Sequence, residues 1–273
     1  MDLTWDLYNP TSRADRLLVV APSLGGNCSH QWAKVAELLT NDAQVVFVDY
    51  PGHALSEVWN DADEPTLDVV ASAIMDVIHE VRERTGELPV IFAGLSIGGA
   101  TGLHLARDHA DELAGVAVLC SAATVGEPDR WIERAEQVEA AGTQQLVEET
   151  SKRWFTPAFK AANPRVTTTI MEGLAAADDH SYAQLCRCLA HHDLRADLAD
   201  IRCPLLLVAG ERDSSTPIAG QELVAETVPG AQLSVIPEAS HQVTVAAPDT
   251  TANLLRAFMD RVARQARKEL PDD

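Results

Sequence analysis

The sequence predicts an α/β fold in which a mostly parallel sheet has helices on both faces and an inserted helical segment. Short apolar runs alternate with helical patterns up to Cys120, and this alternation is typical of parallel strands joined by crossover helices. Helical patterns alone then occupy the chain from Pro128 to about Leu194. Further apolar runs follow this segment, so it is expected to interrupt a single sheet.

The first part of the predicted core covers residues 1–124. Apolar side chains recur at helical spacing from Thr66, a typical N-cap residue, to Gly86. An Ala- and Leu-rich helix is expected at Gly99–His109. The apolar runs predict a short edge strand followed by buried strands, in chain order Trp5–Tyr8, Arg16–Ala21, Val45–Val48, Leu88–Ala93 and Gly115–Cys120.

Residues 125–195 are predicted to form a helical cap. Proline favours the first turn of a helix, so helices are expected to start at Pro128 and Pro164. Segments inserted at the carboxyl ends of parallel strands surround the ligand crevice of such sheets. The rest of the core, residues 196–273, is expected to contain strands at Pro204–Ala209 and Gln232–Ile236 and a final helix from near Pro248.

Composition and charge limit the function classes. Of 273 residues, 46% are apolar, which is enough for a sizeable core. The 41 acidic and 21 basic side chains give a formal net charge of −20. Such a chain is expected to bind neither nucleic acid nor an anionic membrane, because its average field repels both. No apolar run approaches the ~20 residues that cross a bilayer, and the N-terminus lacks the features of a secretory signal.

The cysteines bear on compartment and metal binding. They are five in number and spread along the chain, so reduced thiols in a cytoplasmic protein are expected. Cys186, Cys188, His191 and His192 form a dense set of metal-ligand types, but the Cys-x-Cys spacing sets the two thiols far apart around a helix. The sequence therefore predicts no metal and no cofactor, and it leaves assembly into a homo-oligomer open.

Gly94-Leu95-Ser96-Ile97-Gly98 carries the strongest chemical signal. It matches Gly-x-Ser-x-Gly and lies between a predicted buried strand and a predicted helix, the setting in which a serine is presented as a nucleophile. Small residues on both sides of Ser96 let the helix pass close to the strand. Ser96 is therefore the candidate nucleophile.

A serine hydroxyl needs a base within hydrogen-bond reach, and the base needs an orienting carboxylate. Asp213 and His241 each follow a predicted strand, and a parallel sheet brings such strand ends to one crevice. Glu211 is an alternative carboxylate, but Asp213 is preferred. The backbone amides of Leu24, in a glycine-rich loop, and of Ile97, directly after the serine, are the candidate oxyanion donors.

These residues give the chain a resemblance, over nearly its full length, to α/β-hydrolases with a helical cap. More narrowly, it resembles the 3-oxoadipate enol-lactonases. The triad stretches are shared by the whole superfamily, whereas the cap stretches favour the lactonases. The matching stretches are Ser23-Leu24-Gly25, Gly94–Gly99, Leu119-Cys120, the spacing Gly126-x-x-x-x-Trp131, Arg153–Pro157, Asp193–Arg195, Gly210-x-x-Asp213-x-x-Thr216-Pro217 and Ser240-His241.

The resemblance implies a hydrolase of a small-molecule carboxylic ester or lactone. In the narrower case it implies conversion of an enol-lactone to 3-oxoadipate in aromatic-compound breakdown. Other uses of the fold stay open: a general carboxylesterase, a carbon–carbon bond hydrolase, a cofactor-free perhydrolase or a non-catalytic small-molecule receptor.

One stretch departs from the related enzymes. Where they have Asp-x-Arg-Gly-His-Gly, this chain has Asp49-Tyr50-Pro51-Gly52-His53-Ala54. The loop borders the pocket in such folds, so this departure is expected to affect the choice of substrate and to leave the triad unchanged.

Cap side chains are the candidates for substrate binding. Trp131 and Trp154 are expected to shape an apolar lid, although cap helices also need such side chains for their own packing. Candidate receptors for a substrate carboxylate, each with a solvated face as the alternative, are Arg130 and Arg134 and, beside them, Lys152, Arg153 and Arg187.

Overall fold

A sheet of parallel strands with one antiparallel edge forms the centre of the molecule. The computed structural model describes residues 1–269, and its strands follow the order β1-β3-β2-β4-β5-β6-β7. β1 pairs with β3 in the antiparallel sense, and the other pairs are parallel. The predicted α/β fold is therefore confirmed. The strands are β1 Thr4–Leu7, β2 Leu17–Ala21, β3 Gln44–Asp49, β4 Val90–Leu95, β5 Gly115–Leu119, β6 Leu205–Gly210 and β7 Gln232–Ile236.

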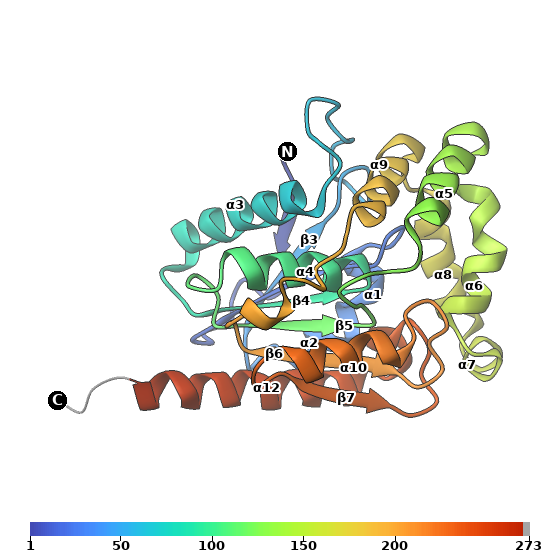
Figure 1. Ribbon diagram of the computed structural model, residues 1–273. Helices are drawn as coiled ribbons and strands as arrows, with labels where there is room; N and C mark the ends of the chain where they lie inside the picture. Colours follow the sequence, from blue (N-terminus) through green and yellow to red (C-terminus); the bar gives the residue numbers. More distant parts are fainter. Residues whose placement is uncertain (270–273) are drawn as a thin grey trace.

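Helices cover both faces of the sheet (Figure 1). Strand side chains such as Val19 and Phe92 pack with α3, α4 and α10 on one face. The alternate side chains, such as Val20 and Ile91, pack with α2 and α12 on the other. Because successive side chains point to opposite faces, strands covered on both sides read as continuous apolar runs. The helices outside the cap are α1 Cys28–Gln31, α2 Ala33–Leu38, α3 Leu67–Thr85, α4 Ile97–Asp108, α10 Ile218–Thr227, α11 Val243–Ala246 and α12 Pro248–Glu269.

The chain between β5 and β6 is helical, and it gathers beyond the carboxyl ends of the parallel strands (Figure 1). It has a small core of its own, which contains Trp154, Phe155, Ile170 and Met171. Within residues 1–269, no helix is both long and apolar enough to span a membrane. The cap helices are α5 Pro128–Ala141, α6 Val147–Trp154, α7 Pro157–Ala162, α8 Pro164–Ala175 and α9 Asp179–Ala190.

The structure differs from the sequence prediction mainly in short helices. The sequence patterns assign no helix to α1, α2, α10 or α11. α1 and α11 have four residues each, which is too few to show a helical period. α10 buries only Gln221 and Val224, so its apolar pattern is weak. β4 runs to Leu95 instead of ending at the predicted Ala93, and Ser96 follows it directly.

Asp49, the last residue of β3, is expected to make stability depend on pH. Its Oδ1 accepts a hydrogen bond from the Cys28 amide at 2.7 Å, but burial outweighs this bond and raises the pKa of Asp49 to about 6. A carboxyl whose folded pKa lies above its unfolded pKa stabilises the fold at low pH. That contribution is lost as the pH rises through the folded pKa.

Asp49→Asn keeps the acceptor oxygen and removes the charge. The variant is expected to raise the free energy of unfolding by about 2 kcal/mol at pH 8 and by well under ~1 kcal/mol at pH 4. Urea denaturation at both pH values measures the difference. Asp111→Asn, in an exposed connection between α4 and β5, is the matched control. An equal gain at both pH values would rule out this account.

Candidate active site

Ser96 occupies a sharp turn between β4 and α4. Its backbone has φ 59° and ψ −115°, a strained conformation for a residue with a side chain, and such strain is typical of functional positions. Steric crowding explains why the motif has glycine at positions 94 and 98. A Cβ on Gly94 would lie 2.0 Å from the Gly98 carbonyl, and a Cβ on Gly98 would lie 2.8 Å from the Ala21 carbonyl oxygen. The close approach of α4 thus keeps Ser96 at the tip of the turn.

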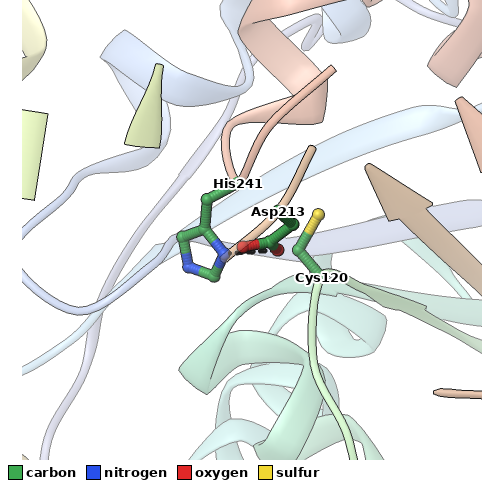
Figure 2. A group of neighbouring side chains, drawn as sticks. All are labelled: Cys120, Asp213 and His241. Carbon is green, nitrogen blue, oxygen red and sulfur yellow. Dashed lines mark hydrogen bonds and ion pairs between the residues drawn. The ribbon is translucent and has the colours of Figure 1, made fainter. Parts of the chain in front are cut away.

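Asp213 and His241 form a buried pair (Figure 2). Oδ2 of Asp213 lies 2.8 Å from Nδ1 of His241, and both side chains are almost inaccessible to solvent. Asp213 follows β6 and His241 follows β7, so the parallel sheet brings them together. Glu211 is exposed, and its carboxylate accepts a hydrogen bond from the Glu238 amide. Of these two carboxylates, only that of Asp213 contacts the histidine.

His241 and the loop after β6 together hold the Asp213 carboxylate in its charged form. The amides of Ser215 and Thr216 donate to Oδ1 at 2.8 and 3.1 Å, and the Thr216 hydroxyl donates to Oδ2 at 2.6 Å. Burial alone would raise the pKa of Asp213, but the charge and hydrogen bond of His241, together with the Thr216 bonds, bring it below its usual range. An ionised Asp213 accepts the Nδ1 proton of His241, which leaves Nε2 free to act as a base. Sequence reasoning gave Thr216 no role of its own.

Cys120, directly after β5, lies against the same pair (Figure 2). Its Sγ, an Asp213 oxygen and a His241 nitrogen lie within 4.8 Å of one another, an arrangement also found around metal ions. Burial, and then the charge of Asp213, raises the pKa of the Cys120 thiol well above its usual range. The structure thus has a hydrogen-bonded Asp213–His241 pair beside a buried, protonated thiol.

The two candidate oxyanion donors have no hydrogen-bond partner within the described residues. The Ile97 amide belongs to the first turn of α4, where backbone N–H groups have no partner within the helix. The Leu24 amide lies in a turn closed by a 2.8 Å bond from the Gly26 amide to the Ser23 carbonyl. Within residues 1–269, neither the Leu24 nor the Ile97 amide donates a hydrogen bond.

One cavity of about 560 Å³ is lined by Leu24, Ser96 and His241 together with cap side chains. This volume suits a small molecule. Ser96 and His241 both reach its wall, although within the described residues no hydrogen bond joins them. The Trp154 and His241 rings pack with centroids 6.3 Å apart. The cap side chains predicted to bind substrate, Trp131, Trp154, Arg130 and Arg134, all line this cavity, and so do Leu24, Arg153 and Tyr182.

The arginines of the cavity differ in their partners. Arg130 is exposed and pairs with Glu133 at 3.1 Å. The Arg134 guanidinium packs over the Trp131 ring, 5.3 Å from its centroid, and interacts with the Tyr182 hydroxyl. Within residues 1–269 it has no carboxylate within 4.0 Å. Arg153 has Glu149 at 3.7 Å, while its Nε is buried and finds no partner in the described part of the chain. Burial and the neighbouring Arg134 charge lower the pKa of Arg153. Two half-buried cations therefore converge on this cavity in a chain of net charge −20.

One expectation from the sequence is placed differently by the structure. The loop Asp49–Ala54 contributes no residue to the cavity wall, so the prediction that it borders the pocket is wrong. Its His53 lies behind the Leu24 loop, where Nε2 accepts a hydrogen bond from the Gly25 amide at 2.9 Å. In the cysteine- and histidine-rich stretch, both ring nitrogens of His192 have partners, His104 Nε2 at 3.0 Å and the Ala122 carbonyl at 2.8 Å.

Comparison with known proteins agrees with this geometry. The sequence model of a family described as "Alpha/beta hydrolase family" matches residues 18–254. 3-Oxoadipate enol-lactonase 1 of Acinetobacter baylyi is 31% identical over 245 residues, which are 90% of this chain and 89% of that protein. 3-Oxoadipate enol-lactonase 2 of the same organism is 29% identical over 256 residues, 93% of this chain and 92% of the relative.

A solved structure shows the same likeness in three dimensions. The crystal structure of the enol-lactonase from Burkholderia xenovorans LB400 superposes with a TM-score of 0.87 at 27% identity, over 94% of this chain and 96% of the other. The matched family and these relatives are hydrolases, and their likeness extends over nearly all of this chain. The chain therefore belongs to the α/β-hydrolase family.

Proposed function

We propose that this hydrolase cleaves a carboxylate-bearing lactone or ester with a Ser96–His241–Asp213 triad, and that its substrate is 3-oxoadipate enol-lactone in aromatic-compound breakdown. The observation that carries the proposal is the cavity in which Ser96 and the Asp213-held His241 face two cap arginines that lack full ion pairing. The names of the relatives support the choice of an enol-lactone.

In the first step, His241 Nε2 takes the Ser96 proton while Oγ attacks the lactone carbonyl carbon. Asp213 stabilises the imidazolium, and the Leu24 and Ile97 amides stabilise the oxyanion. The ring C–O bond then breaks, and the enol oxygen takes the proton from His241. The result is an acyl-enzyme whose acyl chain still carries the released enol, which becomes the ketone.

In the second step, His241 removes a proton from water, which attacks the acyl carbonyl and forms a second oxyanion in the same place. Collapse of this intermediate returns the proton to Ser96 and releases the dicarboxylate. The Ser96–His241 hydrogen bond that both steps need is expected to form with substrate present, because such bonds are often long in unliganded enzymes.

The two cap arginines are the proposed receptors for the free carboxylate of the lactone. A guanidinium binds a carboxylate with two parallel hydrogen bonds, and Arg134 has no protein carboxylate in the described structure to compete for it. Arg153 lies beside Arg134, and a ligand anion would relieve the repulsion between the two cations. Arg130 is already paired with Glu133, so we assign it no direct role.

Turnover on a panel of substrates tests this proposal. The panel holds a muconolactone-derived enol-lactone, its methyl ester and neutral p-nitrophenyl esters. The expected result is a higher kcat/KM for the free-acid lactone than for any neutral compound. Preference for a neutral ester would favour a general carboxylesterase. Activity only on a dienone diketoacid or with peroxide would favour the carbon–carbon hydrolase or perhydrolase.

Arg134→Met keeps much of the side-chain volume and removes the charge. It is expected to raise KM for the free-acid lactone about 10- to 100-fold, because hydrogen bonds to charged groups contribute roughly 1.5–3 kcal/mol. KM for the neutral esters should change by less than about threefold, because they lack the carboxylate. Arg130→Met is the matched control and should leave both values near those of the native chain. An equal loss on charged and neutral substrates would remove the carboxylate role.

A further inference from the structure

His53 does not line the cavity, yet both of its ring nitrogens have hydrogen-bond partners within the protein. It is 1% exposed. Its Nδ1 lies 2.8 Å from the Pro51 carbonyl oxygen, which can only accept a hydrogen bond, so the ring proton is on Nδ1. Nε2 is then unprotonated and accepts the hydrogen bond from the Gly25 amide. Burial lowers the pKa of His53, against the smaller opposing effects of the Pro51 bond and the Asp178 charge, and this keeps the ring in its neutral form.

The other side of the same loop is fixed in a similar way. The Ser23 amide donates to Gln31 Oε1 at 2.9 Å, and Gln31 Nε2 donates to the Ser23 hydroxyl at 2.7 Å. Buried side chains therefore accept the amide protons of Ser23 and Gly25, the residues on each side of Leu24. The Leu24 amide between them has no partner within residues 1–269. These two bonds restrict the rotation of the peptide groups around it.

Helix α9 of the cap packs against His53 and its loop. The Tyr182 ring of α9 stacks on the His53 ring, with centroids 6.4 Å apart and planes at 21°. The Asp178 amide, at the start of α9, donates to the Gly52 carbonyl at 2.9 Å. A Cβ on Gly52 would lie 2.4 Å from the Ser181 side chain, so the loop and α9 are in close contact. Tyr182 also lines the cavity.

We propose that His53 is a positioning residue that aligns the Leu24 amide with the oxyanion through its hydrogen bond to Gly25, and that α9 of the cap fixes His53 in this role. The inference rests on the proposed function, because it assumes that Leu24 is an oxyanion donor. The loop Asp49–Ala54, whose sequence departs from that of the related enzymes, then orders the Leu24 loop, while cap side chains contact the substrate.

Two replacements of His53 separate this role from simple packing. His53→Gln places an amide oxygen where Nε2 accepts the Gly25 bond, whereas His53→Phe keeps a flat ring and offers no acceptor. The Phe variant is expected to lower kcat at least tenfold with KM within about threefold, since loss of an oxyanion donor acts on the transition state and removal of a donor outright costs about 10²–10³ in kcat. The Gln variant should recover most of this loss.

Binding of phenylboronic acid adds a readout that packing alone would not move. Its tetrahedral adduct with Ser96 places an oxygen among the oxyanion donors, so its affinity should fall with kcat in the Phe variant, while the affinity for the planar product acid should not. Equal kcat in the Phe and Gln variants, or equal losses for boronate and product, would overturn the inference. Should the Phe variant not fold, ¹⁵N NMR of the native His53 ring tests the hydrogen bond itself. A protonated Nε2 could not accept a bond from the Gly25 amide and would overturn the inference.

The outcomes also separate this inference from the proposed function. Lack of Ser96 labelling by a fluorophosphonate in the native chain would remove the proposed function itself. Normal labelling and normal native turnover, with no difference between the two His53 variants, would remove only the positioning role.

Discussion

Ser96→Ala is expected to lower kcat on the enol-lactone and on p-nitrophenyl esters by a factor on the order of 10⁴ or more. Without Oγ no acyl-enzyme forms, and the oxyanion amides can accelerate only direct attack by water. KM should change little, because the Cβ stays in place and the arginine contacts lie in the cap. Steady-state kinetics together with loss of fluorophosphonate labelling measure both consequences.

Ser72→Ala, on the exposed surface of α3, is the matched control and should retain native rates and labelling. The residual rate of the Ser96 variant should also lack a burst of p-nitrophenol, since a burst reports an accumulating acyl-enzyme. If Ser96→Ala keeps near-native hydrolysis of every compound in the panel, the triad mechanism is wrong.

Asp213→Asn is expected to lower kcat by about 10³–10⁴ with little change in KM. The amide fills the same space, but it is neutral and presents either an acceptor or a donor to His241 Nδ1. A donor there would force the proton onto Nε2, and even an acceptor would leave the imidazolium without its stabilising charge. The Ser215 and Thr216 amides can only donate, and they hold the Oδ1 position, so the amide oxygen is expected there and the NH₂ group against His241 Nδ1. The Thr216 hydroxyl at the other position can turn to accept. The wrong histidine tautomer and the lost charge are therefore expected to act together.

Glu211→Gln supplies the comparison for this variant. Glu211 is two residues away and exposed, and its contacts are with Arg212 and the Glu238 amide. Its replacement should leave kcat within about twofold of the native value, as for other exposed polar changes. A large loss in the Glu211 variant beside a small loss in the Asp213 variant would reverse the assignment of the triad carboxylate.

Much of the fold could be predicted because strand and helix periods are local. The run from Leu88 and the following Gly-x-Ser-x-Gly already predicted a strand, a tight turn and a helix, and the structure has β4, Ser96 and α4 in those places. Helical periods could not predict α1 and α11, because each has four residues, which are too few to display a period. It also misplaced the loop of His53, because nothing in Pro51-Gly52-His53 tells which side of the Leu24 loop it contacts.

The sequence by itself determined which candidate groups gather at the site, since residues at the carboxyl ends of parallel strands meet at one edge of the sheet. Order and spacing therefore give Ser96, Asp213 and His241 as the candidate nucleophile, carboxylate and base. The tertiary structure decided what depends on contacts between distant segments: the choice of Asp213 over Glu211, the convergence of Arg134 and Arg153, and the bond from Gly25 to His53. Side chains far apart along the chain leave no periodic signal of such contacts, which arise only when the cap packs over the sheet.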